Sequence, residues 1–325
     1  MKKWVRHTFI VTTAALLIST LQIIYAESVP TKLIVKDKVI TEDLPTIMDS
    51  DRTLIPLRIV SEALDAQVMW DVNTSTATVQ IWGERLNLKP NAQHAQLQGG
   101  SNNDEILELE SPAKLKKGTL YVPLRLIAQS FGYKVSWVPG EISINSPLSE
   151  EQEDVLYRGS LEEARWEIIR LFQPVHYMNT PLNVTNINGN YENYDNTYIF
   201  PEGEVLSYYH LDGDTISWIE LKDDFLVCTW QAHFKDLNYD HLDSFLQMNI
   251  KDDTGETPHL NKEMLYYSQG YFGDSSHEQY GQIDGNGNYT LIAYEHIVGG
   301  SVTNSEGTMT LTLPGEVRTD YKYDY

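Results

Sequence analysis

Two segments of this chain repeat each other at a constant offset, and this repeat constrains the fold more than any other feature. Residues 56–70 read PLRIVSEALDAQVMW and residues 123–137 read PLRLIAQSFGYKVSW, which align without a gap. The identical pairs are Pro56 and Pro123, Leu57 and Leu124, Arg58 and Arg125, Val68 and Val135, and Trp70 and Trp137. A gapless match of this length predicts two copies of one structural unit.

Each copy has the pattern of a strand, a short helix and a hairpin. Residues 53–55 and 120–122 are β-prone runs that end at a proline, which suits the first turn of a helix because it has no N–H to donate. Leu57, Val60 and Leu64 then recur at helical spacing. A strand with valine and tryptophan in alternation follows in each copy, and we expect the tryptophan to cover the helix. Further strands are expected at 76–82, 85–88 and 141–144.

The repeated arginines are the first candidate binding residues. Arg58 lies four residues before Glu62, a spacing that supports an ion pair worth only about 0.3 kcal/mol, whereas Arg125 is followed at that spacing by Gln129. We therefore interpret both arginines as fixing a loop or the contact between the two copies, in preference to forming a ligand site.

The two copies resemble the copper amine oxidase N-terminal domain, also called the stalk domain. The resemblance rests on the runs RTLIPLR at 52–58, EAL at 62–64 and VMWD at 68–71, and on GTLYVPLR at 118–125 through Trp137. It covers about residues 31–146, with departures at Asp65, at 129–131 and in the turn at 138–140. The resemblance implies an accessory α+β module of exported, mostly Gram-positive bacterial proteins, joined to many kinds of partner domain.

The resemblance does not imply amine oxidation. The quinone motif of the oxidases is echoed at 190–193 and 193–196, but the required threonine is replaced by Ile187 and Asn190. The histidines after Ala26 include no His-x-His pair, which a copper site of that kind normally uses. We expect no catalytic residues, no cofactor and no amine oxidase activity.

Residues 1–26 have the pattern of a secretory signal peptide. Lys2, Lys3 and Arg6 form a basic start, an apolar run covers about residues 9–24, and Ala26 is a small residue at the expected cleavage point. The run is short for a membrane span and is interrupted by polar residues, which favours cleavage over a retained anchor. We therefore expect a secreted or cell-wall-associated protein with no membrane span after cleavage.

Charge is distributed unevenly along the chain. Residues 27–147 carry 12 Lys and Arg against 15 Asp and Glu, whereas residues 148–325 carry 9 against 31. A surface with this excess of carboxylates repels phosphate backbones and anionic headgroups. We therefore expect no nucleic-acid binding.

The second half has mostly strand signals after one helix. Residues 148–159 are polar and acidic and are expected to form a linker, and a helix is expected at 160–172. Short polar turns separate the later β-prone runs and favour an antiparallel arrangement, either a sheet against the single helix or a partly open barrel. The expected strands are 198–200, 205–211, 215–221, 225–234, 263–271, 289–297 and 308–313.

Three features of the second half are weighed as sites. Asp284, Asn286, Asn288 and Glu295 match four positions of a calcium loop, but Tyr289 replaces the required glycine, so a hairpin turn is the preferred interpretation. The many aromatic and acidic residues would suit a saccharide-binding face or a pair of hydrolytic carboxylates, although no motif supports either. The single cysteine, Cys228, lies in an apolar run and is expected to be a buried strand residue.

The sequence therefore predicts an α+β protein organised as a signal peptide (1–26), a duplicated strand-helix-hairpin stalk module (27–147), a linker (148–159) and an acidic β-rich domain (160–325). The favoured function is that of a non-catalytic envelope or extracellular protein whose stalk presents the acidic domain to a partner, either a cell-wall glycan or another envelope protein. The alternative is a cell-wall glycan or peptide hydrolase with catalytic carboxylates in the second half.

Overall fold

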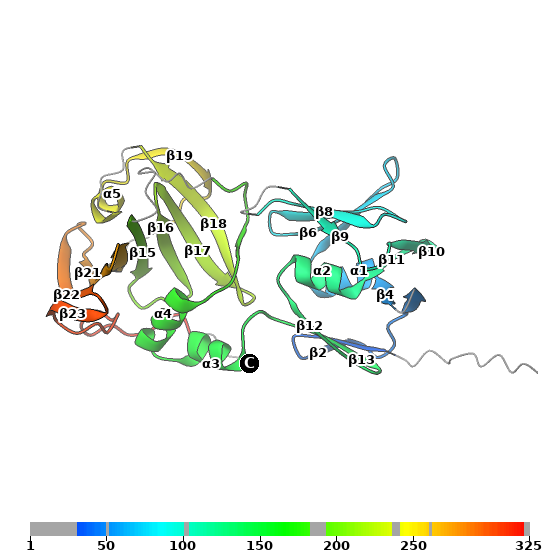
Figure 1. Ribbon diagram of the computed structural model, residues 1–325, viewed down its shortest axis with the longest axis horizontal. Coiled ribbons are helices and arrows are strands. Elements are labelled where there is room, and N and C mark those ends of the chain that lie inside the picture. Colours follow the sequence, from blue (N-terminus) through cyan, green and yellow to red (C-terminus); the bar gives the residue numbers. More distant parts are fainter. Residues whose placement is uncertain are drawn as a thin grey trace, which may run out of the picture.

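The computed structural model describes residues 31–49, 52–100, 104–182, 193–235, 241–259 and 262–321. The predicted signal peptide lies outside these residues. Figure 1 shows two bodies side by side, which we call the repeat module (residues 31–147) and the β domain (residues 148–321). The described chain is mainly β, with five short helices and largely antiparallel sheets. In the described part of the chain, no helix is long and apolar enough to cross a membrane.

The repeat module contains three small sheets and two helices among its described residues. The first sheet has the order β12-β13-β1-β2, the second β10-β11-β4-β3 and the third β5-β6-β7-β8-β9. Their bounds are β1 Lys32–Val35, β2 Lys38–Thr41, β3 Ile47–Asp49, β4 Arg52–Pro56, β5 Gln67–Asp71, β6 Thr76–Ile81, β7 Glu84–Leu88, β8 His94–Gln98, β9 Glu105–Glu108, β10 Lys114–Lys116, β11 Thr119–Pro123, β12 Lys134–Val138 and β13 Glu141–Asn145. The helices are α1 Leu57–Ala63 and α2 Leu124–Ser130.

The two helices and their flanking strands fall at the repeat offset. Strand β4, helix α1 and strand β5 begin and end at positions equivalent to those of β11, α2 and β12 respectively, in the register that aligns Pro56 with Pro123. Asp65 and Gly132, which follow the two helices, both adopt a positive φ, of 57° and 81°. Aspartate tolerates this left-handed conformation better than most residues, so its replacement of glycine leaves the helix end unchanged.

The central strands β4 and β11 pair with each other about a local two-fold axis. They run antiparallel, and Ile55 of β4 lies opposite Val122 of β11. These two residues are equivalent in the repeat, and both are completely buried. An antiparallel pair centred on equivalent residues relates the two copies by a rotation of about 180°. Each copy therefore meets the other through the same surface.

The β domain is built on one ten-stranded sheet with the order β14-β18-β17-β16-β15-β20-β21-β22-β23, and β19 pairs with β18. Among the described pairings of this sheet, only that of β14 with β18 is parallel. The bounds are β14 Val175–Tyr177, β15 Asn193–Pro201, β16 Ser207–Asp212, β17 Thr215–Lys222, β18 Phe225–Phe234, β19 Ile250–Gly255, β20 Met264–Phe272, β21 Ser275–Ile283, β22 Tyr289–Val298 and β23 Ser301–Glu306. The helices are α3 Glu150–Arg158, α4 Leu161–Arg170 and α5 His241–Gln247.

The segment expected to be a linker is a helix instead. Ser149 begins α3 with a capping box, in which its side chain and that of Gln152 each accept a hydrogen bond from the other's backbone N–H. Glutamates in the first turn favour the positive end of the helix. The expected single helix is therefore one of three in the described part of this domain. Strands β14, β19, β21 and β23 were not expected, and the described residues 308–313 form no strand, contrary to the prediction.

Two apolar cores fill the β domain. One joins the sheet to α3, α4 and the C-terminal segment, for example through Leu156, Ile168 and Leu311. The other lies beneath α5 and β19 and contains Trp230 and Phe245. The aromatic residues of the sheet are therefore largely interior, including Tyr208, Tyr209, Tyr266 and Tyr267.

The two bodies share a buried seam. Phe225 and Val227 of β18 belong to the core of the repeat module, where Phe225 packs against Trp82 and Tyr133. His176 of β14 lies 3.1 Å from a carboxylate oxygen of Glu84, and both side chains are buried. The N–H of Gly83 donates to the carbonyl of Tyr177 at 2.9 Å. The contact is thus an apolar and hydrogen-bonded interface, in addition to the covalent connection.

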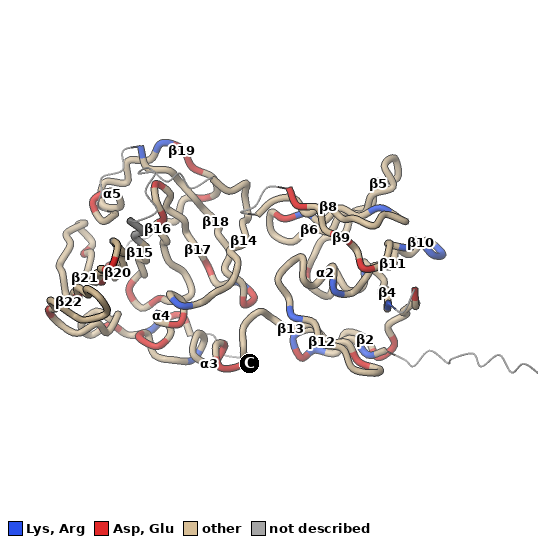
Figure 2. Tube along the Cα trace, in the orientation of Figure 1, with Lys and Arg blue, Asp and Glu red and all other residues tan. Residues whose placement is uncertain are grey.

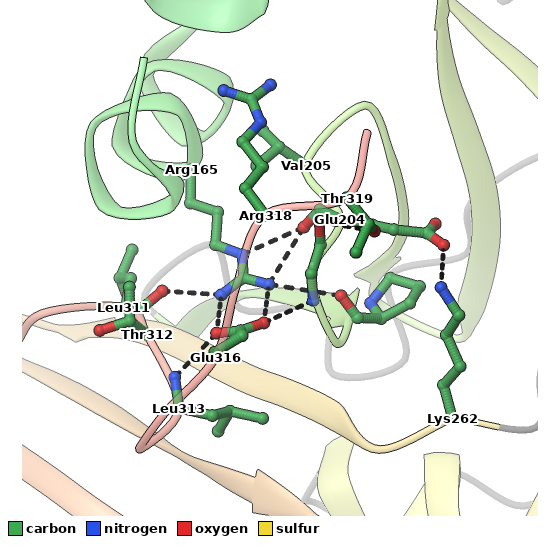
Figure 3. Close-up of polar contacts among 12 residues, drawn as sticks. Arg165, Glu204, Val205, Lys262, Leu311, Thr312, Leu313, Glu316, Arg318 and Thr319 are labelled. Atoms are coloured by element: carbon green, nitrogen blue, oxygen red, sulfur yellow. Dashed lines mark hydrogen bonds and ion pairs between the residues drawn. The ribbon is translucent and has the colours of Figure 1, made fainter. Parts of the chain in front are cut away.

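The C-terminal segment is held by a buried arginine of α4 (Figure 3). Arg165 makes a two-pronged contact with the carboxylate of Glu316, at 2.6 and 2.8 Å, and both side chains are fully buried. The guanidinium N–H groups also donate to carbonyls of Pro201, Glu204 and Leu311. This arrangement joins a helix, a hairpin turn and the C-terminal segment at one point.

The protonation of Glu316 follows from this environment. Burial alone would raise the pKa of its carboxyl, but hydrogen bonds from Arg165, the charge of Arg165 and the N–H groups of Gly203 and Leu313 together lower that pKa below its usual range. A lowered pKa in the folded state contributes stability above the unfolded-state pKa, and this contribution is lost as the pH falls through the folded-state value.

We expect Glu316→Gln to lower the free energy of unfolding by about 3–5 kcal/mol at neutral pH, because it leaves the buried charge of Arg165 uncompensated. The matched control is Asp154→Asn, which breaks the exposed pair with Arg158 and should cost less than about 1 kcal/mol. Urea unfolding measures both. The difference between wild type and Glu316→Gln should shrink as the pH is lowered below the usual range of a glutamate. Equal effects of the two substitutions would contradict the role given to Arg165.

Candidate functional site

Two open grooves on the repeat module are the candidate site. The first, which we call the Trp70 groove, has a volume of about 570 Å³ and is lined by α1, β5 and the β10–β11 hairpin. The second, the Trp137 groove, has a volume of about 510 Å³ and is lined by α2, β12 and the hairpin of β3 and β4. Both volumes lie in the range of small-ligand sites.

The linings of the two grooves are equivalent in the repeat. The five identical pairs of the segments 56–70 and 123–137 all line them, one member in each groove. Three further pairs at the same offset come from the opposite copy, namely Leu115 and Met48, Thr119 and Arg52, and Leu120 and Thr53. Each groove is therefore formed by both copies together, and one copy alone would provide only part of its lining.

The tryptophans of the grooves are partly open to solvent. Trp70 is 39% exposed and Trp137 is 57% exposed, and each lies on a strand that also carries a partly buried valine. Each tryptophan was predicted to cover its helix, and each indole does line a groove together with residues of that helix, but part of it stays open to solvent. Leu115 and Met48 are also exposed at equivalent positions in the two grooves. Exposed aromatic area of this kind is a typical feature of recognition surfaces.

The arginines of the grooves are exposed and paired with carboxylates. Arg58 contacts Glu62 of its own helix at 3.2 Å. In the second groove Glu110 lies between two arginines, 3.7 Å from Arg125 and 3.4 Å from Arg52. Arg52 and Arg125 thus connect the two copies through Glu110. Arg58 makes no such contact among the described ion pairs, so the equivalent arginines Arg58 and Arg125 differ in their partners.

The charged lining of both grooves is positive on balance. Arg58 is the charged residue that lines the first groove, and Arg52, Arg125 and Glu110 line the second. The whole chain has a net charge of −22. Figure 2 shows Lys and Arg at β10, β4 and α2, whereas Asp and Glu are frequent over the β domain. A third groove next to the second is acidic, with Glu105, Glu108 and Glu110 in its lining.

A polar row crosses the sheet of the β domain and was missed by the sequence reasoning. Tyr198, His210, Ser217 and Gln231 lie side by side on four successive strands. Gln231 donates to Ser217 at 3.0 Å, and His210 contacts the amide oxygen of Asn196. Burial and, to a smaller extent, the nearby charge of His241 lower the pKa of His210 to about 4, so this imidazole is neutral at physiological pH. A histidine with so low a pKa is a weak general base near neutrality.

The residues of the calcium-loop pattern are only partly brought together. Asp284 accepts hydrogen bonds from the backbone N–H groups of Asn286 and Asn288 at 2.8 Å, which closes the hairpin turn between β21 and β22. Glu295 lies farther along β22, opposite Glu278 of β21. In the described ranges, no three His, Cys, Asp or Glu side chains are grouped as a metal site. The interpretation of this segment as a turn therefore fits the observed hydrogen bonds.

The quinone-motif echoes and the single cysteine form no site in the described residues. Of the two quinone-motif echoes, residues 190–192 lie outside the described chain, and residues 193–196 form part of β15. Cys228 is buried, and this burial raises the pKa of its thiol to about 12, despite the opposing hydrogen bonds of Ser217 and Trp230. A thiol in this state is not a nucleophile near neutral pH.

Comparison with known proteins identifies the repeat module. Residues 34–145 match the copper amine oxidase N-terminal domain, which confirms the resemblance predicted for about residues 31–146. The match covers the two grooves and ends before α3. No curated protein matches the chain.

The exposed indoles should contribute little to folding. We expect Trp70→Ala and Trp137→Ala each to lower the free energy of unfolding by less than about 1.5 kcal/mol, because much of each side chain already contacts water. The matched control is Trp230→Ala in the buried core, which should cost about 3–5 kcal/mol. Urea unfolding compares the three variants. A loss at Trp137 as large as that at Trp230 would make Trp137 a structural residue.

Proposed function

We propose that this protein is an exported, non-catalytic protein of the cell envelope or extracellular space, in which a stalk module presents an acidic binding domain. In this proposal residues 27–147 are the duplicated stalk module and residues 160–325 are the domain that is presented. The family match over residues 34–145 supports the stalk assignment. The basic start and apolar run within residues 1–26 support export.

The seam between the two bodies is the observation that carries the proposal. Phe225 of the β domain lies in the core of the repeat module, and the buried Glu84–His176 contact lies beside it. Lys36 adds contacts to the Asp223 carbonyl and to the carboxylates of Asp223 and Asp224 at the rim. A packed seam of this kind fixes the orientation of one body on the other, whereas a flexible linker would leave it free. Fixed orientation is what a stalk requires.

The proposed partner is a cell-wall glycan or another envelope protein, bound by the acidic domain. Residues 148–325 hold 31 Asp and Glu against 9 Lys and Arg, which favours partners that carry cationic groups. The alternative function, a wall hydrolase, has one specific observation in its favour. Glu278 and Glu295 lie directly opposite each other on β21 and β22, a placement in which their like charges repel.

Incubation with purified cell wall separates the two functions. We expect the protein to sediment with the wall and to release no soluble glycan or peptide fragments. The heat-denatured protein should neither sediment with the wall nor release fragments. Glu278→Gln is the decisive variant, because it would abolish hydrolysis by this carboxylate pair and leave a non-catalytic protein unchanged. Fragment release by the wild type that is lost in Glu278→Gln would overturn the proposal in favour of the hydrolase.

A further inference from the structure

We propose that the Trp70 and Trp137 grooves are a pair of equivalent binding sites for an acidic polysaccharide, each taking one carboxylate-bearing sugar unit. This goes beyond the proposed function, which assigns partner binding to the acidic β domain and treats the repeat module as a support.

Each groove combines the two groups that an acidic sugar needs. An exposed indole offers a flat apolar surface to the C–H face of a sugar ring, in the same way that it packs against other apolar groups. Arg58 or Arg125 lies in the same groove and presents a planar fork of N–H donors that matches a carboxylate. The glutamates paired with these arginines supply acceptors for neighbouring hydroxyl groups.

Charge selects an anion at these grooves. In a chain with a net charge of −22, the second groove has Arg52 and Arg125 against Glu110, and the first presents Arg58, which pairs with Glu62 at 3.2 Å. Beside the Trp137 groove, the acidic groove with Glu105 and Glu108 repels a carboxylate and so favours the tryptophan side. A carboxylate-bearing ligand is therefore favoured over a neutral one and over a cationic peptide.

The residues that are identical in the two copies include two that packing does not explain. Val60 and Leu64 are buried, and their equivalents are Ile127 and Phe131, so the interior has changed between the copies. The solvent-exposed arginine and the half-exposed tryptophan are the same in both. Packing accounts for the identity of the buried Leu57 and Leu124, but it does not require the exposed arginine and tryptophan to be the same in both copies.

Two equivalent sites suit a ligand that repeats. A polysaccharide offers the same sugar unit many times, so both grooves can bind at once. Binding at one groove raises the effective concentration at the other, which can increase the overall affinity roughly 100-fold over one site. A globular partner would have to present the same surface twice to achieve this.

Calorimetry with a soluble acidic glycan tests the proposal on the whole protein. The probes are a short oligogalacturonate, polygalacturonate and methyl-esterified polygalacturonate, which keeps the chain but removes most of the charge. We expect two oligomers to bind per chain, the polymer to bind roughly 100-fold more tightly than the oligomer, and the esterified polymer at least about 10-fold more weakly than the acidic one. Added salt should weaken binding.

Variants assign the binding to the grooves. Trp70→Ala or Trp137→Ala should leave one bound oligomer per chain and should remove most of the higher affinity for the polymer over the oligomer. The double substitution should abolish binding. Arg58→Gln with Arg125→Gln should remove the preference for the acidic polymer. Phe172→Ala is the control, because Phe172 is a fully exposed aromatic residue of the β domain that lines neither groove.

Three results would overturn the proposal. They are equal binding of the acidic and esterified polymers, undiminished binding in the double tryptophan variant while its unfolding curve matches wild type, and absence of binding to all three probes. None of these results would contradict wall binding by the β domain, because sedimentation of the double tryptophan variant with cell wall tests that function separately.

Discussion

The pairing of Ile55 with Val122 is the contact on which the rest of the repeat module depends. It sets two equivalent residues opposite each other on antiparallel strands, so the two copies are related by a local two-fold rotation. A shift by one residue would turn both buried side chains toward the opposite face of the sheet, and the core would resist it. The same rotation brings the hairpin of one copy against the helix of the other, which creates both grooves.

The β domain is stabilised in a different way from the module. Its long sheet has an apolar core on each face, and its C-terminal segment is attached through the buried Arg165–Glu316 pair and through Arg318, which donates to the carbonyls at the end of α3. Polar contacts of this kind specify geometry because an unmatched buried charge is costly. The domain therefore has a fixed C-terminal attachment and a fixed seam with the module, although its surface is strongly acidic.

Local structure followed from the sequence wherever short-range chemistry decides it. Pro56 and Pro123 mark the helix starts, and the alternation after each helix marks a strand. The capping box at Ser149 carries the same kind of signal, but the acidic run that follows it is equally typical of a linker. The grooves could not be predicted, because Met48 and Trp137 are far apart in the sequence and line one groove only once β4 has paired with β11. The partial exposure of Trp70 and the polar row at His210 also depend on which sheet face is covered, which local patterns do not encode.

The indole N–H signals of the mature protein provide the most direct test of the two equivalent grooves. Titration with oligogalacturonate should shift the signals of both Trp70 and Trp137, because each indole lies in a groove with the arginine of the same repeat position. The signals of Trp82, Trp166, Trp218 and Trp230, which lie in the seam and in the β domain, should stay in place. Shifts confined to these other tryptophans, or unchanged signals of Trp70 and Trp137, would contradict the account.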